Sequence, residues 1–208
     1  TLAAARADSV TVTLADGTET PIERSVLVTG VVEGSPFDSL SPNTTIERVN
    51  GTPVRTEAGF QTALRNTTVA TLGTAGGEQV TGPVGALVVA VPDEPAADAG
   101  MPTETPLVVT HIGGERVPSQ TALNAVLDAR DPGEEVTVRA HGGNGAERYS
   151  VTLGERDGSS YLGVQVYQGT SGLLVSDFGA KLYPAGTYLQ MAGGDATGSG
   201  IAGFLRGI

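Results

Sequence analysis

The stretch from Ile46 to Leu64, I-E-R-V-N-G-T-P-V-R-T-E-A-G-F-Q-T-A-L, decides the fold because the chain repeats it between Val109 and Leu127. The two copies match without a shift in register. The matched pairs are Ile46 with Val109, Val49 with Ile112, Gly51 with Gly114, Val54 with Val117, Phe60 with Leu123, and Leu64 with Leu127. A period of about sixty residues is too long for a solenoid unit and fits two small domains in tandem.

Each copy predicts a strand, a tight turn and a helix, in that order. The turns fall at Asn50-Gly51 and Gly113-Gly114, pairs that supply the positive φ such a turn needs. Thr56 and Ser119 are the expected N-caps of the two helices. The matched apolar residues are expected to fill the core of each domain.

Three further stretches alternate with period two around a glycine turn, which predicts β-hairpins. They are Ser9–Ile22 around Asp16-Gly17, Val69–Val84 around Gly76-Gly77, and Val136–Leu153 around residues 142–145. A short apolar strand is predicted after each hairpin, beginning at Val26, Ala86 and Leu162. The last of these opens like a third unit at Tyr161–Val164, but neither a helix nor a matching hairpin follows.

Four segments are predicted. Residues 1–24 form an N-terminal hairpin that belongs beside or within the first domain, residues 25–83 form the first domain, and residues 84–157 form the second. Residues 158–208 form a C-terminal extension that is expected to lead toward a membrane segment. The starting point of the repeating unit along the chain is ambiguous.

The composition excludes several classes of function. The 208 residues contain no cysteine, so disulfides, thiolate metal sites and cysteine nucleophiles are absent. Acidic residues number 23 against 12 basic ones, and the net charge of -11 argues against nucleic acid or an anionic membrane as the main partner. A surface rich in carboxylates and poor in lysine is typical of proteins that work in concentrated salt. An ordinary acidic protein from a GC-rich genome has the same balance.

No catalytic or metal-binding motif is found. His111 and His141 are the only histidines, and neither has a glutamate at metalloprotease spacing, so we expect no zinc site. Gly169–Gly172 does not form a nucleophile elbow. Gly193–Gly200 lacks the lysine of a phosphate-binding loop, and we expect it to be a flexible connector.

Two observations bear on location. No apolar run is long enough to span a membrane, and the first residues do not make a complete signal peptide, so we expect a soluble region cut from a longer protein. Asn43, Asn50 and Asn66 each begin an N-glycosylation sequon, which favours an outward-facing region.

A family resemblance rests on four consecutive stretches. They are G-A-L-V-V-A-V at Gly85–Val91, P-A-A-D-A-G-M at Pro95–Met101, V-T-H-I-G-G-E-R-V at Val109–Val117, and the helix after Ser119. Together they resemble a PDZ domain in the permuted form found in bacterial and archaeal proteases, and Val26–Leu64 resembles a second one. The pair, followed by Tyr161–Val164 and Gly172–Ala180, is similar to the insert of archaeal site-2 proteases, which are intramembrane zinc metalloproteases.

The resemblance implies an α+β, mainly β fold of two tandem PDZ-like domains, residues 25–83 and 84–157, each a small, partly open β-barrel with a groove helix. In such a groove an extended peptide pairs with the edge strand after a glycine loop, and loop N–H groups hold a terminal carboxylate. The implied peptide-binding loops are Ser25, Val26, Leu27 and Val28, and Gly85, Ala86, Leu87 and Val88. The implied groove-helix residues are Glu57, Gln61 and Leu64, and Gln120, Asn124 and Leu127. Ser25 departs from the glycine pattern and is expected to narrow its carboxylate site.

The implied function is substrate gating in a membrane-associated site-2 protease, with this region on the extracytoplasmic side. Its partners would be extended or C-terminal peptide segments of a membrane-protein substrate and the parent's own transmembrane domain. This region itself needs no cofactor, and the parent enzyme would carry zinc. Two alternatives stay open: the PDZ region of an HtrA-like serine protease and a free-standing extracellular adaptor. A further alternative is that each groove is covered by a neighbouring strand or by the other domain.

The final residues form an apolar stripe of Ile201, Phe204, Leu205 and Ile208. One hypothesis packs this helix on the second domain. The other docks it on the membrane part of the parent, with Gly193–Gly200 as a hinge.

Overall fold

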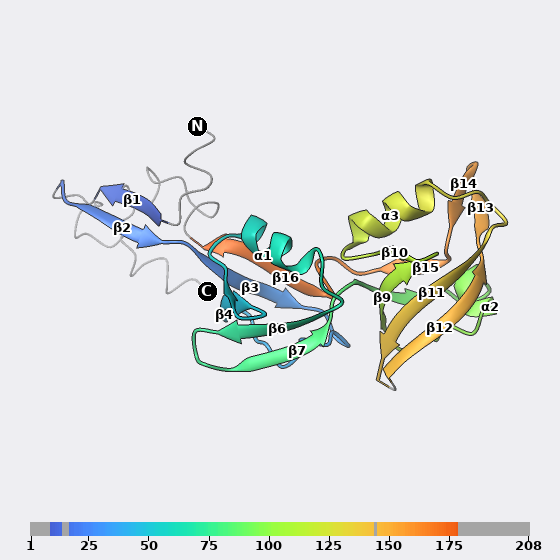
Figure 1. Cartoon of the computed structure of the whole chain (residues 1–208), viewed down its shortest axis with the longest axis horizontal. Helices are drawn as coiled ribbons and strands as arrows, with labels where there is room; N and C mark the ends of the chain where they lie inside the picture. Colours follow the sequence, from blue (N-terminus) through green and yellow to red (C-terminus); the bar gives the residue numbers. More distant parts are fainter. Residues whose placement is uncertain (1–8, 14–16, 144, 179–208) are drawn as a thin grey trace, which may run out of the picture.

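The computed structural model of this chain describes residues 9–13, 17–143 and 145–178. This described part is mainly β, with two open sheets of six strands each, two separate strand pairs and three helices. The sheets lie side by side along the long axis of the molecule, and each has one of the two longer helices beside it (Figure 1).

The first sheet is antiparallel throughout and carries helix α1 (Glu57–Leu64). Its strands, in spatial order, are β16 (Leu173–Phe178), β3 (Ser25–Val31), β4 (Thr45–Val49), β6 (Val69–Thr74) and β7 (Gln79–Pro83). The short strand β5 (Thr52–Pro53) pairs with β4.

The second sheet is also antiparallel and carries helix α3 (Gln120–Asp128). Its strands, in the corresponding order, are β15 (Val164–Val166), β8 (Ala86–Ala90), β9 (Leu107–Ile112), β11 (Glu135–Gly142) and β12 (Gly145–Thr152). The short strand β10 (Glu115–Arg116) pairs with β9, and α2 (Pro95–Asp98) lies between β8 and β9 in the chain.

Two strand pairs stand outside the large sheets. They are β1 (Ser9–Thr13) with β2 (Glu19–Glu23), and β13 (Gly154–Arg156) with β14 (Ser159–Tyr161). The first pair confirms the hairpin predicted around Asp16-Gly17, and the pairs β6 with β7 and β11 with β12 confirm the other two.

The turns of the repeat have the predicted backbone conformation. Asn50 and Gly51 have φ of 50° and 80°, and Gly113 and Gly114 have φ of 57° and 87°. Positive φ at both central residues is what a two-residue turn of type I′ requires, and it matches the twist of the strands on either side. These turns join β4 to β5 and β9 to β10.

Both helices begin at the predicted caps. The hydroxyl of Thr56 accepts a hydrogen bond from the Gly59 N–H at 3.0 Å, and that of Ser119 accepts one from the Ala122 N–H at 3.3 Å. Each cap satisfies an N–H group that the first helical turn leaves without a partner.

The apolar residues matched in the repeat are all buried, which confirms the predicted cores. Those of the first copy, Ile46, Val49, Val54, Phe60 and Leu64, lie in one hydrophobic cluster under α1. Those of the second copy, Val109, Ile112, Val117, Leu123 and Leu127, lie in another under α3. A fully buried side chain of this kind contributes about 1.5–3 kcal/mol by leaving water.

The described residues after the predicted boundary, 158–178, do not form a third unit. Instead β15 joins the second sheet and β16 returns to the first. The buried side chain of Leu162 fills the second core and that of Leu173 fills the first, so these residues complete both cores. The predicted hinge at residues 193–200 and the apolar stripe at 201–208 lie outside the described residues.

Within residues 9–13, 17–143 and 145–178, no helix has both the length and the apolar character needed to cross a membrane.

Candidate functional site

Residues 163–178, here called the return segment, lie along both of the strands predicted to accept peptides. The segment passes first along β8 as β15 and then along β3 as β16, antiparallel to each. In Figure 1 it crosses from the second sheet to the first and runs beside α1. This arrangement corresponds to one of the alternatives left open by the sequence, namely that a neighbouring strand covers each groove.

The contact with β8 is short and regular. Three residue pairs join the strands, from Val164 opposite Ala90 to Val166 opposite Val88. Backbone hydrogen bonds extend the pairing at both ends: the Val91 N–H donates to the Gly163 carbonyl at 3.0 Å, and the Tyr167 N–H donates to the Leu87 carbonyl at 2.9 Å. The outer edge of β8 is thus paired with the return segment from Leu87 to Val91.

Ser171 joins the return segment to the loop that precedes β8. Its hydroxyl accepts a hydrogen bond from the Gly85 N–H at 3.0 Å and donates one to the Pro83 carbonyl at 2.8 Å. Its own N–H donates to the Gly85 carbonyl at 2.8 Å, and its carbonyl accepts from the Ser35 hydroxyl at 2.8 Å. The Ser171 side chain is fully buried. The Gly85 N–H was predicted to help hold a peptide carboxylate. In the structure it donates its hydrogen bond to the Ser171 hydroxyl instead.

Gly85 is required here by a close backbone approach. A Cβ atom at this position would lie 2.1 Å from the Val109 carbonyl oxygen, which no side chain tolerates. Ser25, the corresponding residue of the first copy, begins β3 and is half-buried. It lines a hollow of about 280 Å³ together with Arg24 and Arg55.

The contact with β3 is longer. Six residue pairs join β16 to β3, from Leu173 opposite Val31 to Phe178 opposite Ser25, with an irregularity between Leu174 and Val175. The Val32 N–H adds a hydrogen bond to the Gly172 carbonyl at 2.8 Å. Strand β16 also packs the buried side chain of Leu173 into the first core.

Two of the three predicted residues of the first groove helix contact the return segment. The backbone N–H of Glu57, in the first turn of α1, donates to the Asp177 carboxylate. The Thr170 hydroxyl donates to the Gln61 side-chain carbonyl at 3.2 Å. Leu64 instead points into the core and is 2 % exposed. The negative charge of Asp177 at this end of α1 is favourable because the helix N-terminus carries a partial positive charge.

The second groove helix leaves space beside the return segment. Asn124 and Leu127 of α3 line a hollow of about 230 Å³, and Val164 and Val166 of β15 line its other side. Gln120, at the start of α3, is half-buried and does not line it. The outer edge of β8 is therefore paired with β15, and a hollow remains beside β15 and α3.

A polar cluster also lines this hollow. Arg156 forms an ion pair with Glu94 at 2.9 Å, and its guanidinium lies 4.3 Å from the centre of the Tyr161 ring. The Tyr161 hydroxyl donates to the same carboxylate, and this hydrogen bond raises the pKa of Tyr161 above its usual value.

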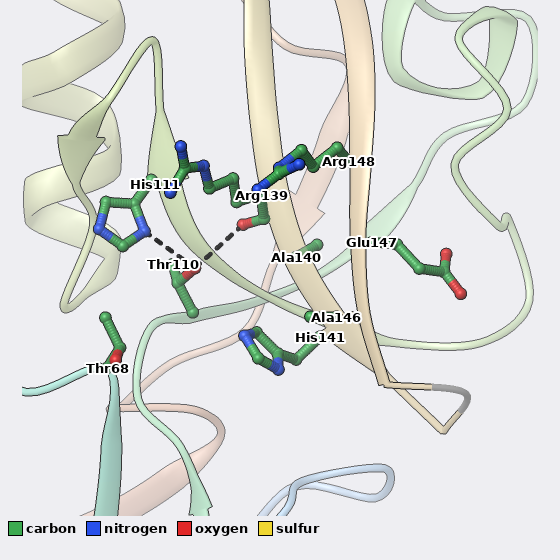
Figure 2. Close-up of a pocket in the computed structure, with 9 residues that line it drawn as sticks. All are labelled: Thr68, Thr110, His111, Arg139, Ala140, His141, Ala146, Glu147 and Arg148. Carbon is green, nitrogen blue, oxygen red and sulfur yellow. Dashed lines mark hydrogen bonds between the residues drawn. The ribbon is translucent and has the colours of Figure 1, made fainter.

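Both histidines of the chain line one hollow of about 650 Å³ on the second sheet (Figure 2). The His111 ring is within hydrogen-bond distance of the Thr110 hydroxyl, at 3.1 Å. Burial, followed by the charges of Arg116, Arg139 and His141, lowers the pKa of His111. In the described part of the chain, no group of three or more histidine, cysteine or acidic side chains is arranged to hold a metal ion. The donor set present does not fit zinc.

Among the solved structures that this chain resembles over part of its length are two PDZ domains. One is the PDZ domain of the SdrC-like protein from Listeria monocytogenes, with 22% identity over 39% of this chain and 86% of that domain, and a TM-score of 0.35. The other is the PDZ domain of the SdrC-like protein from Listeria innocua, with 22% identity over 41% of this chain and 94% of that domain, and the same TM-score of 0.35. No protein-family model and no curated protein matches the sequence.

Proposed function

We propose that this chain is a peptide-binding region of two tandem PDZ-like domains, and that its own return segment occupies both grooves until a peptide replaces it. The observation that carries the proposal is the continuous path of residues 163–178 along β8 and then β3. Each of these strands lies in the position from which the sequence predicts strand addition.

Strand addition needs an edge whose N–H and C=O groups are free to pair with an extended chain. The return segment uses the outer edges of β8 and β3 in this way, which supports their ability to bind a peptide of the same geometry. An incoming peptide gains main-chain hydrogen bonds only where it displaces those of the segment. The apparent affinity of the peptide is therefore its intrinsic affinity multiplied by the fraction of molecules in which the groove is open.

The second groove opens more easily than the first under this proposal. Three residue pairs hold β15, whereas six hold β16. Each intramolecular hydrogen bond contributes roughly 0.5–1.5 kcal/mol net, so the shorter strand is released at lower cost. Val164 and Val166 are half-buried and border a hollow, whereas Leu173 of β16 is 2% exposed.

The wider role that we propose is substrate gating in an intramembrane, site-2-type zinc metalloprotease, with this region on the extracytoplasmic side. The sequence resemblance supports this role, and the acidic composition suits a halophilic setting. Substrate segments with an exposed end would compete with the return segment, and the parent's transmembrane domain would supply zinc and catalysis. Flanking sequence tests this role directly. An H-E-x-x-H motif in a hydrophobic segment supports it, whereas G-x-S-x-G indicates an HtrA-like parent.

Engineered disulfides test the binding mechanism, because the chain has no cysteine of its own. Gln165→Cys with Val89→Cys joins two directly opposed residues of β15 and β8. Ser176→Cys with Leu27→Cys does the same for β16 and β3, so each pair locks one groove. Directly opposed strand residues fall within the Cα separation of about 4.4–6.8 Å that a disulfide spans.

The probe is a synthetic peptide with the sequence of residues 163–178, as free acid and as amide. We expect the reduced β15–β8 variant to bind it and the oxidised variant to lose most of that binding. The β16–β3 lock should have the smaller effect. Binding that is equal in the oxidised and reduced β15–β8 variants, or absent from both, contradicts the proposed mechanism.

A further inference from the structure

Four basic residues form a single row across the second sheet. Arg116 of β10 lies opposite His111 of β9, His111 lies opposite Arg139 of β11, and Arg139 lies opposite Arg148 of β12. The row crosses four neighbouring strands in a chain whose net charge is -11. Its members come from distant parts of the sequence, and the register of the sheet brings them together.

The side chains of the row share one face. Directly opposed residues of antiparallel strands point to the same side, with Cβ atoms about 4.5–5.5 Å apart. His111, Arg139 and Arg148 follow one another across the strands in Figure 2. Arg139 and Arg148 are exposed, so the row is open to solvent.

The two exposed arginines lack acidic partners within the part of the chain that the structure describes. Two other arginines of this half are paired with acidic side chains: Arg130 with Glu115 at 2.7 Å and Glu134 at 2.8 Å, and Arg156 with Glu94. No such ion pair is formed by Arg139 or Arg148. Like charges directly opposite each other destabilise a sheet, so the pairing of these two residues has a cost.

In the described part of the chain, acidic side chains lie near the row but form no ion pair with Arg139 or Arg148. Glu147 precedes Arg148 in β12, but its carboxylate points away from the arginines in Figure 2 and accepts a hydrogen bond from the Tyr149 hydroxyl. Glu135 is on the same strand as Arg139, four residues away, which is about 13 Å in an extended strand.

The row borders two hollows of about 650 Å³ each, and Arg139 and Arg148 line both. The first hollow is also lined by His111, His141, Thr110 and Glu147, and the second is also lined by Glu134 and Glu135. Guanidinium groups that face a hollow with imidazole and hydroxyl groups present many N–H and O–H donors and two permanent positive charges.

We propose that this row binds a small tetrahedral dianion of the phosphate class, held between the guanidinium groups of Arg139 and Arg148 and bordered by His111 and His141. Two charges on the ligand balance the two arginines. Its four oxygens can accept from both guanidinium forks at once, whereas a single carboxylate has only two oxygens. Binding replaces the repulsion between the arginines with two charge-assisted contacts. This site is independent of the proposed peptide grooves.

The test is a titration of the whole chain with inorganic phosphate, followed by the ring C–H resonances of the two histidines. The titrations use constant ionic strength, because screening by added salt would otherwise weaken any contact between charges. We expect saturable shifts with a dissociation constant of roughly a millimolar, the range of a weak site worth about 4 kcal/mol. Acetate at equal ionic strength should bind at least about tenfold more weakly.

Arg139→Gln and Arg148→Gln should each weaken phosphate binding about tenfold. The matched control is Arg156→Gln, which removes an arginine that is already paired with Glu94. Without phosphate, Arg148→Gln should melt at or above the temperature of the unsubstituted chain. Added phosphate should stabilise the unsubstituted chain and the control more than it stabilises Arg139→Gln or Arg148→Gln. Shifts that do not saturate, or phosphate affinities unchanged in both Arg139→Gln and Arg148→Gln, overturn the proposal.

Discussion

The hydroxyl of Ser171 accepts a hydrogen bond from the backbone N–H of Gly85 at 3.0 Å, across 86 positions of sequence. This contact fastens the return segment at the start of β8, where the segment leaves the second sheet for the first. It places a neutral side-chain oxygen at an N–H group that sequence analysis assigned to a peptide carboxylate. The same hydroxyl donates to the Pro83 carbonyl, so one buried side chain satisfies two backbone groups of the loop.

Ser171→Ala should therefore lower the free energy of unfolding by about 1–3 kcal/mol, because it leaves the buried N–H of Gly85 and the carbonyl of Pro83 without these partners. Chemical denaturation measures the loss. Ser150→Ala is a suitable control, since Ser150 is exposed on β12. Equal stability of the two variants would show that the Ser171 hydrogen bonds do not stabilise the attachment of the return segment.

The matched leucines of the repeat allow a paired test of the cores. Leu64 is 2% exposed and Leu127 is 7% exposed beside the hollow of the second groove. Truncating either to alanine should cost about 2–5 kcal/mol, with Leu64→Ala the more costly because its surroundings are fully packed. Asn124→Ala, on the exposed face of α3, is the near-neutral control. A Leu127→Ala variant as stable as this control would contradict the assignment of Leu127 to the core.

Arg116 links the second sheet to the end of α1 in the first. Its guanidinium donates to the carbonyls of Arg65 at 3.2 Å and Leu64 at 3.4 Å, where a helix C-terminus carries partial negative charge. Arg116→Met should cost about 1 kcal/mol and loosen the contact between the two halves. Arg65→Met is the matched control, because only the backbone carbonyl of Arg65 takes part. The comparison uses denaturation together with NMR relaxation, and identical behaviour of the two variants would exclude the link.

The lowered pKa of His111 predicts a loss of stability in acid. Burial is the first cause, followed by the charges of Arg116, Arg139 and His141, so the folded chain takes up this proton less readily than the unfolded chain. Stability should fall as the pH drops below the ordinary value of 6.5 and should stop falling below the lower folded pKa. His111→Gln should flatten this part of the profile in denaturation experiments on either side of that pH. A profile unchanged by the substitution would contradict the assignment.

Much of the fold follows from local sequence. Positive-φ pairs such as Asn50-Gly51 fix the turns, Thr56 and Ser119 fix the helix starts, and the matched apolar residues fix the cores. These signals act within a few residues of one another, so a single sequence carries them. They also explain why three hairpins are predicted at the correct places.

The pairing of the return segment could not be predicted in the same way. Strand β15 has only three residues, too few for a clear alternation, and its partner is chosen by which sheet edge is open rather than by its neighbours in sequence. Ser171 lies in a glycine-containing stretch in which local sequence gives no sign of a buried hydroxyl. The basic row is equally nonlocal, since it depends on the register of β9, β11 and β12 and on the irregularity beside Arg139.

Native-state hydrogen exchange of the unsubstituted chain, without added peptide, tests most directly whether the return segment can leave its groove. We expect the amides of Tyr167 and Val91, which donate hydrogen bonds across β15 and β8, to exchange through a partial opening. Amides in the centre of β9 and β11 should exchange only through global unfolding, and β16 should be intermediate. If β15 exchanges with the same free energy and denaturant dependence as β9, the segment is a permanent strand of the second sheet and the proposed displacement by peptide is wrong.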